Sequence, residues 1–370
     1  MLDQLLQNMV ERDASDLFVT SGFAVSAKIN GKLTPLMETS LTDQAALDLV
    51  HEAMSDKQRD EFHTTKECNF AIAREGIGRF RCSAFWQRDQ AGMVIRRIVT
   101  QIPNAEDLGL PPVLKDIIMS KRGLVLFVGG TGTGKSTSLA ALIGHRNTNS
   151  HGHILTIEDP IEFVHEHKNC VVTQREVGID TQSFDDALKS SLRQAPDVIL
   201  IGEIRSMETM EYAMSFADTG HLCVATLHAN NANQAIERIM HLAPKDQHDK
   251  LRFDLSLNIR AIVAQQLVPT PDGKGRVAAI EILLNSPLVR DLIQRNEIGA
   301  LKEAMKKGKE QGMQSFDMAL YDLYKDGRID MDQALHHADS PNDLRLMIKL
   351  DKSDGSSLGT LSNVSIDMDD

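Results

Sequence analysis

The chain has 370 residues, of which 42% are hydrophobic and 25% are charged, so its composition is that of a globular protein rather than of a disordered one. This length predicts two domains, since a domain usually has ~100 to 200 residues. The formal net charge of -12 argues against a nucleic-acid backbone as the main ligand, because such ligands need a positive surface.

The first hundred or so residues predict a small α+β domain. Apolar residues at helical spacing over residues 2–10 predict an amphipathic first helix. Short apolar stretches separated by turn signals predict strands and hairpins over residues 16–34. A second strand-rich stretch is expected over residues 68–99, with its turn at Gly76 and Gly78.

A linker and an α/β domain are predicted next. The stretch IPNAEDLGLPP, residues 102–112, has the composition of a linker. Beyond it, apolar runs alternate with helical patterns, which predicts parallel βαβ units with helices on both faces of the sheet. After Leu283 the pattern becomes mostly helical and indicates a small bundle.

The predicted organisation therefore has five parts. They are an α+β domain at 1–100, a linker at 101–115, an α/β core at 116–284, a helical region at 285–350 and an acidic tail at 351–370. The tail is rich in Ser, Asp and Gly and has few large apolar residues, so we expect it to be disordered.

The start of the chain and its apolar runs predict a cytoplasmic protein. Asp3 stands where a signal peptide would have Lys or Arg. The longest apolar run, Leu124 to Val128, is far shorter than the ~20 residues that a membrane span needs.

A phosphate-binding loop is the strongest functional signal. Residues 129–136 read GGTGTGKS, a complete G-x-x-x-x-G-K-[ST] motif between the apolar run LVLFV and a predicted helix. The glycines let backbone N–H groups face phosphate oxygens, Lys135 reaches the β and γ oxygens, and the Ser136 hydroxyl reaches Mg²⁺. A glycine-rich turn that binds nothing is the alternative. The predicted nucleotide-binding residues are Gly129, Gly130, Thr131, Gly132, Thr133, Gly134, Lys135, Ser136 and Thr137.

Two further apolar runs end in acidic residues. DVILIGE, residues 197–203, places Glu203 at the end of a strand, where a P-loop fold holds a carboxylate beside the metal and the attacking water. ILTIEDPIEF, residues 154–163, places Glu158, Asp159 and Glu162 just after another strand, where they could orient water or metal. A solvated strand end is the alternative for both segments.

These three segments, with ATLH at 225–228, resemble four motifs of the secretion and type IV pilus ATPases. In chain order they are similar to the Walker A loop, the aspartate box, the Walker B strand and the histidine box. The resemblance implies a PAS-like α+β domain followed by a RecA-like P-loop NTPase domain with a C-terminal helical bundle.

The resemblance is greatest to the retraction branch of these ATPases, the PilT/PilU family, over about residues 1–345. The segments that carry it are ASDL at 14–17, RFR at 79–81, QREVG at 174–178 and TGHL at 219–222. Four other features are more similar to PilU than to PilT. They are GEIRS at 202–206, the pair Gln265-Gln266, LVRDLI at 288–293 and the acidic extension after Ile348.

The resemblance also implies roles by position. Glu203 would join Ser136 in holding magnesium with its water shell, Glu162 would activate the attacking water, and His228 would sense the γ-phosphate. Arg81 and Arg96 would be arginine fingers, which act in trans only within a ring. A surface salt bridge is the alternative role for each arginine.

The implied function is Mg²⁺-dependent hydrolysis of ATP by a homohexameric ring that powers or assists type IV pilus retraction, and so twitching motility. The implied partners are a PilT-like retraction ATPase and a PilC-like platform protein at the inner membrane, with the ring peripheral to that membrane; no nucleic acid is expected. Three alternatives are an accessory nucleotide-binding ring, a pilus-assembly or secretion ATPase, and a RecA-type nucleic-acid motor. The assembly ATPases typically carry a tetracysteine zinc insertion, which this sequence lacks, and the charge of -12 weighs against the nucleic-acid motor.

Overall fold

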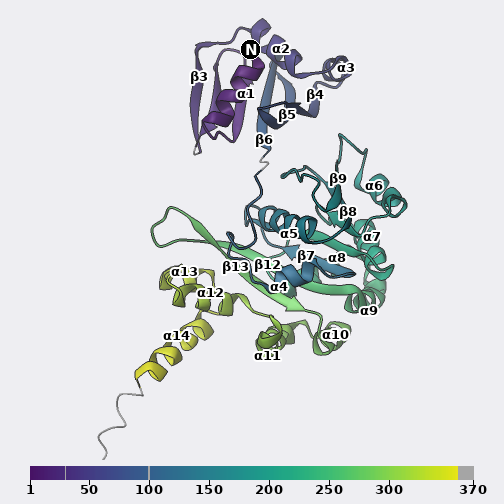
Figure 1. Cartoon of the computed structure of the whole chain (residues 1–370), viewed down its shortest axis with the longest axis vertical. Coiled ribbons are helices and arrows are strands. Elements are labelled where there is room, and N and C mark those ends of the chain that lie inside the picture. The colour runs from purple at the N-terminus through teal and green to yellow at the C-terminus, as the bar shows by residue number, and fades with distance from the viewer. Residues whose placement is uncertain (30, 99–100, 357–370) are drawn as a thin grey trace, which may run out of the picture. The chain divides into compact units, whose positions relative to one another are not determined.

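The computed structural model describes residues 1–29, 31–98 and 101–356 (Figure 1). The chain forms two compact units. The first unit contains Met1–Ile102, Thr156–His167 and Val172–Ser190, and the second contains Pro103–Leu155, Lys168–Val171 and the chain from Ser191 onward.

The first unit is built on a six-stranded sheet in the order β3-β2-β1-β6-β5-β4, with antiparallel pairing throughout. Its leading elements are α1 (Leu2–Glu11), β1 (Asp16–Thr20), β2 (Ala24–Ile29), β3 (Lys32–Ser40), α2 (Asp43–Ala53), α3 (Asp56–Thr65), β4 (Glu67–Arg74), β5 (Gly78–Gln87) and β6 (Gln90–Ile98). The predicted first helix, the hairpins and the turn at Gly76 and Gly78 are confirmed.

Apolar packing and local caps explain these elements. Leu2, Leu5, Leu6 and Met9 recur on one side of α1 and are all buried in the core of this unit. The Thr42 hydroxyl accepts a hydrogen bond from the backbone of Ala45 and caps α2. A capping box between Ser55 and Gln58 begins α3.

The second sheet has seven strands in the order β13-β12-β7-β11-β10-β8-β9. The strands are β7 (Gly123–Val128), β8 (Gly152–Glu158), β9 (Cys170–Glu176), β10 (Val198–Ile201), β11 (Leu222–Leu227), β12 (Ile259–Pro269) and β13 (Arg276–Leu284). The pairs β10–β11, β11–β7 and β7–β12 are parallel, and β13 pairs antiparallel with β12. The predicted parallel α/β architecture is confirmed in these strands.

Helices follow the strands and continue beyond the sheet (Figure 1). They are α4 (Val113–Ile118), α5 (Lys135–Asn149), α6 (Phe184–Ser191), α7 (Met207–Asp218), α8 (Ala232–Leu242), α9 (His248–Asn258), α10 (Pro287–Gln294), α11 (Leu301–Lys307), α12 (Phe316–Lys325), α13 (Met331–His337) and α14 (Pro341–Ser356). Helices α5 and α7 pack on β7, and α8 packs on β12. This cover buries the central strands, which is why they read as continuous apolar runs rather than as alternating patterns.

The predicted start of the tail is wrong. The last helix, α14, runs past Asp351 to Ser356. Leu344 and Ile348 are buried, and the Lys325 amine donates to Asp351 Oδ1 at 3.0 Å. These long-range contacts hold the helix although its local composition is polar. The rest of the predicted tail, 357–370, lies outside the described residues.

We expect Leu6→Ala to lower the free energy of unfolding of the first unit by about 2 to 5 kcal/mol, because it removes a fully buried side chain. The single tryptophan, Trp86, stacks on Phe62 in this unit at a centroid distance of 5.4 Å, so its fluorescence during urea unfolding reports on this unit. Gln4→Ala, on the exposed side of α1, is the control and should change that energy by less than ~0.5 kcal/mol. Equal losses from both substitutions would contradict the packing of α1.

Candidate functional site

The loop between β7 and α5 has a shape that requires glycine. Gly129, Gly132 and Gly134 have φ angles of +154°, +77° and +84°, a region that other residues rarely adopt. A Cβ atom on Gly129 would lie 2.6 Å from the carbonyl oxygen of Gln265, and one on Gly134 would lie 2.8 Å from Gln265 Nε2. Gly129 and Gly134 are therefore fixed both by backbone conformation and by close packing, and Gly132 by backbone conformation alone.

Lys135 lies against the loop that precedes it. Its Nζ donates to the carbonyl oxygens of Gly129 at 2.8 Å and Gly130 at 2.7 Å. Helix α5 begins at Lys135, and its N-cap, Gly134, provides no side-chain acceptor for the first backbone N–H groups. The loop and the helix N-terminus thus form a positive pole of the kind that binds phosphate.

The register of the sheet sets two other segments beside this loop. Val128, the last residue of β7, pairs with Leu227 of β11 and with Ala264 of β12. His228 directly follows β11 and Gln265 is the next residue of β12, so they flank the start of the loop. Strand β10 pairs with β11 up to Ile201 and Ala225, which places Glu203 at the same edge of the sheet.

Glu203 and His228, predicted from separate motifs, are in contact. His228 Nε2 lies 3.1 Å from Glu203 Oε1, and the Arg205 guanidinium donates to Glu203 Oε2 at 2.7 Å. Both carboxylate oxygens therefore have partners, and the glutamate side chain is only 19% exposed. The sequence interpretation gave Arg205 no role, although it stands two residues after the strand-end acid.

Gln265 is a further site residue that the sequence interpretation missed. Its Nε2 donates to the Thr133 carbonyl at 2.9 Å, and the side chain is buried at 3% exposure. This bond ties the loop to β12. The only sequence signal was that the pair Gln265-Gln266 differs from the related motif.

The segment after His228 is fixed by a hydrogen bond to a buried acid. Asn231 caps α8, and the backbone N–H of Ala232 donates to Glu281 Oε1 at 2.8 Å. Glu281 is fully buried on β13, and its Oε2 has no hydrogen-bond partner within the described residues. Burial raises the pKa of this carboxyl to about 7. Glu281 thereby fixes where the histidine segment enters the helix.

The remaining predicted acids belong to the first unit. Glu158, at the end of β8, accepts hydrogen bonds from the Thr156 hydroxyl at 2.6 Å and from Gln174 Nε2 at 3.2 Å. Desolvation outweighs these bonds and raises the pKa of Glu158 to about 7. Glu162, four residues further on, is exposed. Strand β8 thus ends in Glu158, a carboxyl with a raised pKa, and is followed by Glu162, an exposed carboxyl.

The two predicted arginine fingers also belong to the first unit and face each other across β5 and β6. Arg81 Nε lies 3.9 Å from Glu176 Oε1, and Arg96 Nε lies 2.7 Å from Asp16 Oδ1. Burial raises the pKa of Glu176, against the effect of Arg81. Within one copy of the chain both arginines therefore make the ion pairs of the alternative interpretation, and their role as fingers stays a prediction.

Comparison with known proteins gives concordant matches. The family described as Type II/IV secretion system protein matches residues 1–316. The type IV pilus ATPase PilU of Pseudomonas aeruginosa is 60% identical over 361 residues, covering 97% of this chain and 94% of that protein. The type IV pilus retraction ATPase PilT of the same organism is 39% identical over 340 residues, covering 92% of this chain and 98% of that protein.

One solved structure extends the likeness to three dimensions. A crystal structure of the pilus retraction motor PilT with bound ADP superposes with a TM-score of 0.87 at 38% identity, covering 94% of this chain and 99% of that one. The higher identity to PilU than to PilT confirms the branch that the sequence features favoured.

The pKa of Glu281 predicts a pH-dependent stability. Between its ordinary value of 4.5 and about 7, the folded protein keeps a proton that the unfolded chain has released, so this group's contribution to stability falls as pH rises through that window. The Glu281→Gln variant cannot ionise at this position. Between pH 5 and pH 8 its free energy of unfolding should therefore fall by on the order of 3 kcal/mol less than that of the unmodified chain. Urea unfolding followed by circular dichroism at both pH values measures this.

Glu237→Gln, at an exposed position on α8, is the matched control for Glu281→Gln. It should keep the pH dependence of the unmodified chain. If Glu281→Gln also kept that dependence, Glu281 would not be the titrating group.

Proposed function

Because this chain belongs to the Type II/IV secretion system protein family, we propose that it is an ATP-hydrolysing motor subunit that powers or assists type IV pilus retraction. The observation that carries the proposal is the register of β7, β11 and β10, which sets the phosphate-binding loop, His228 and Glu203 at one edge of the sheet. The high identity to a protein named as a pilus ATPase along almost the whole chain supports it.

The loop and its helix would hold the nucleotide. Backbone N–H groups of residues 130–136 and the Lys135 amine would bind the β and γ phosphate oxygens. For magnesium, the Ser136 hydroxyl and the Glu203 carboxylate offer oxygen ligands of the type that Mg²⁺ prefers alongside water and phosphate. When bound, the ion supplies charge neutralisation at the β and γ phosphates. Arg205 and His228 would keep the Glu203 carboxylate oriented.

Water activation would be the task of the acids after β8. Glu162 is the proposed base, because it is exposed and can accept a proton from water. Glu158 is the less accessible candidate, because it is only partly exposed and its Oε1 already accepts hydrogen bonds from Thr156 and Gln174. His228 would sense the γ-phosphate and transmit its position to Glu203 through their contact at 3.1 Å.

A homohexameric ring would complete the site. Arg81 and Arg96 stand opposite each other on β5 and β6, so one strand pair presents two guanidinium groups. To act as fingers on a neighbour's nucleotide they would exchange Glu176 and Asp16 for phosphate oxygens, which bind guanidinium in the same forked geometry.

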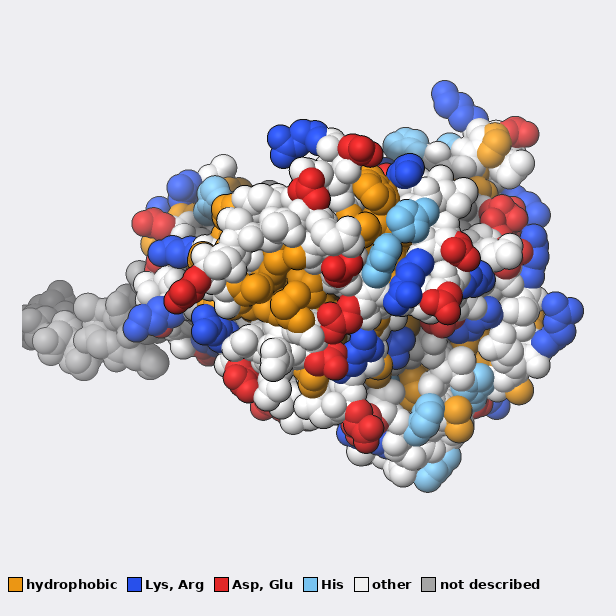
Figure 2. Space-filling model, turned by 90° about the horizontal axis from the view of Figure 1, so that it is seen from above, with side chains coloured by type: hydrophobic (Ala, Val, Ile, Leu, Met, Phe, Trp, Pro, Cys, Tyr) orange, Lys and Arg blue, Asp and Glu red, His pale blue; other side chains and the backbone are white. Residues whose placement is uncertain are grey.

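We also propose a place in the pilus machine. The ring would lie on the cytoplasmic side of the inner membrane and work with a PilC-like platform protein and a PilT-like retraction ATPase. Within the described residues no helix combines the length and apolarity that a membrane crossing requires. On the face drawn in Figure 2 acidic and basic side chains are interspersed, which does not favour nucleic acid as the track.

We expect Lys135→Ala to lower the rate of ATP hydrolysis by at least about 100-fold, because it removes the cation that meets the β and γ phosphates. Phosphate release by the purified full-length protein with Mg²⁺ measures this. Lys274→Ala, at an exposed position between β12 and β13, is the control and should keep the full rate. Turnover that survives Lys135→Ala would refute the proposed site.

The accessory-ring alternative makes a different prediction, which the PilU-like segments motivate. An autonomous motor should hydrolyse ATP alone, whereas an accessory ring should bind nucleotide and hydrolyse it at an appreciable rate only when a PilT-like ATPase is added. The same assay with and without purified PilT, using Lys135→Ala in this chain to silence its share, separates the two. Lys135-dependent turnover without PilT would exclude the pure accessory ring.

A further inference from the structure

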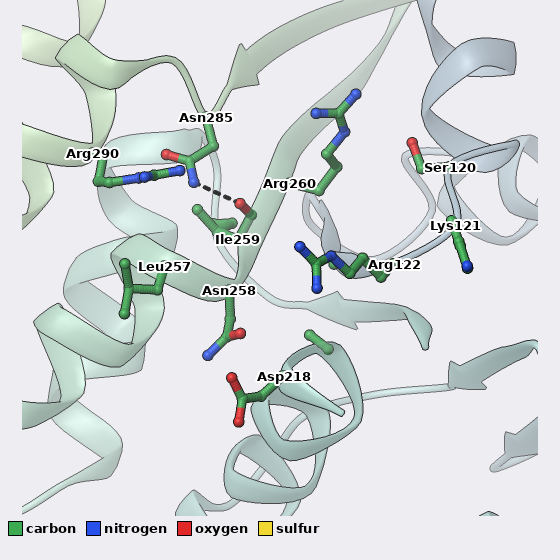
Figure 3. A pocket seen from close by; sticks show the side chains of 12 residues that line it. Ser120, Lys121, Arg122, Asp218, Leu257, Asn258, Ile259, Arg260, Asn285 and Arg290 are labelled. Carbon is green, nitrogen blue, oxygen red and sulfur yellow. Dashed lines mark hydrogen bonds between the residues drawn. The ribbon is translucent and has the colours of Figure 1, made fainter. Parts of the chain in front are cut away.

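A basic hollow lies at the end of the sheet opposite the phosphate-binding loop (Figure 3). Gly123 and Ile259, the first residues of β7 and β12, form part of its wall, whereas the loop follows the last residue of β7. Its volume is about 530 Å³. This is within the usual range for a ligand-binding site, but the lining is polar rather than apolar.

Four cationic side chains surround this basic hollow: Lys121, Arg122, Arg260 and Arg290. They come from the turn before β7, from β12 and from α10, and all four residues are exposed. Within the described part of the chain none of them has an ion pair or a side-chain hydrogen bond.

The nearest acids do not neutralise this charge. Asp291, next to Arg290, pairs instead with Arg295 at 3.0 Å. Asp218 is the one carboxylate among the residues that line the hollow. A chain with a net charge of -12 thus gathers unpaired cations at one place, which favours an anionic occupant.

The surroundings favour a peptide over a lipid surface. A second groove adjoins the hollow through Asp218 and is also lined by Glu211 and Asp254, so the positive charge is confined to the hollow and fits a short segment better than a broad anionic surface. Leu257, which lines the hollow, and Leu288, near Arg290 on α10, are 47% and 46% exposed. The complement of this surface is a segment in which carboxylates alternate with aliphatic side chains, since guanidinium groups bind carboxylates in pairs of hydrogen bonds.

The chain itself contains such a segment. Residues 366–370 read IDMDD, and no Lys or Arg occurs between Ser353 and Asp370. From Ser356, the last described residue, the 14 residues to Asp370 can span up to ~50 Å when extended. We propose that the basic hollow is the docking site for this acidic segment of the same chain. Tethering raises the local concentration of the segment to the millimolar range, so weak contacts suffice.

A peptide-binding assay tests this docking without any use of ATP hydrolysis. The probe is a fluorescein-labelled peptide of residues 361–370, titrated with full-length protein in which Asp367, Asp369 and Asp370 are changed to Asn. We expect the double substitution Arg260→Gln and Arg290→Gln to weaken binding at least tenfold. Lys274→Gln with Arg276→Gln removes the same charge from two exposed positions, one just before β13 and one at its first residue, and should change binding less than twofold. Equal weakening by both pairs, or no binding at low salt, would overturn the proposal.

Two further arms identify the occupant. The unmodified chain should bind the peptide at least tenfold more weakly than the chain with the Asn substitutions, because its own segment already occupies the hollow. Equal binding would mean that the segment docks elsewhere. Vesicles with anionic phospholipid provide the last arm: loss of vesicle binding with unchanged peptide binding in the Arg260→Gln, Arg290→Gln protein would assign the hollow to lipid and overturn the proposal.

Discussion

The parallel register of β7, β11 and β10 is the constraint on which the rest of the site depends. These strands are almost entirely buried, and a slip of their pairing by one residue would move His228 or Glu203 by about 3.3 Å relative to the loop. In this register the carboxyl ends of three neighbouring strands place the phosphate-binding loop, His228 and Glu203 at one edge of the sheet. No single residue of the site is positioned by its own loop alone.

The hairpin of β12 and β13 links this edge to the C-terminal helices. Gln265 donates to the loop at Thr133, and its neighbour Gln266 donates to the carbonyl of His337 at the end of α13. On β13, buried Glu281 holds the start of α8, which follows the histidine segment. Adjacent side chains of one strand thus contact both the loop and the helical region.

The sequence predicted the parts of the site that are local. The loop could be recognised because its glycines, Lys135 and Ser136 are contiguous and lie between a strand and a helix. Gln265 and Glu281 could not, because their partners are 132 and 49 residues away and only strand order brings them together. The basic hollow could not be predicted from the sequence for the same reason, since its four cationic side chains come from three separate segments. The end of α14 was misplaced because buried Leu344 and Ile348 outweigh the polar composition around them.

The most direct test of this account is amide hydrogen exchange of the full-length protein with and without a non-hydrolysable ATP analogue and Mg²⁺. The shared edge predicts that exchange slows together in residues 129–136, 202–205 and 227–231, because one ligand contacts the loop and the two strand ends beside it. Protection confined to the loop, or appearing only elsewhere in the chain, would contradict the claim that the strand register builds a single nucleotide site.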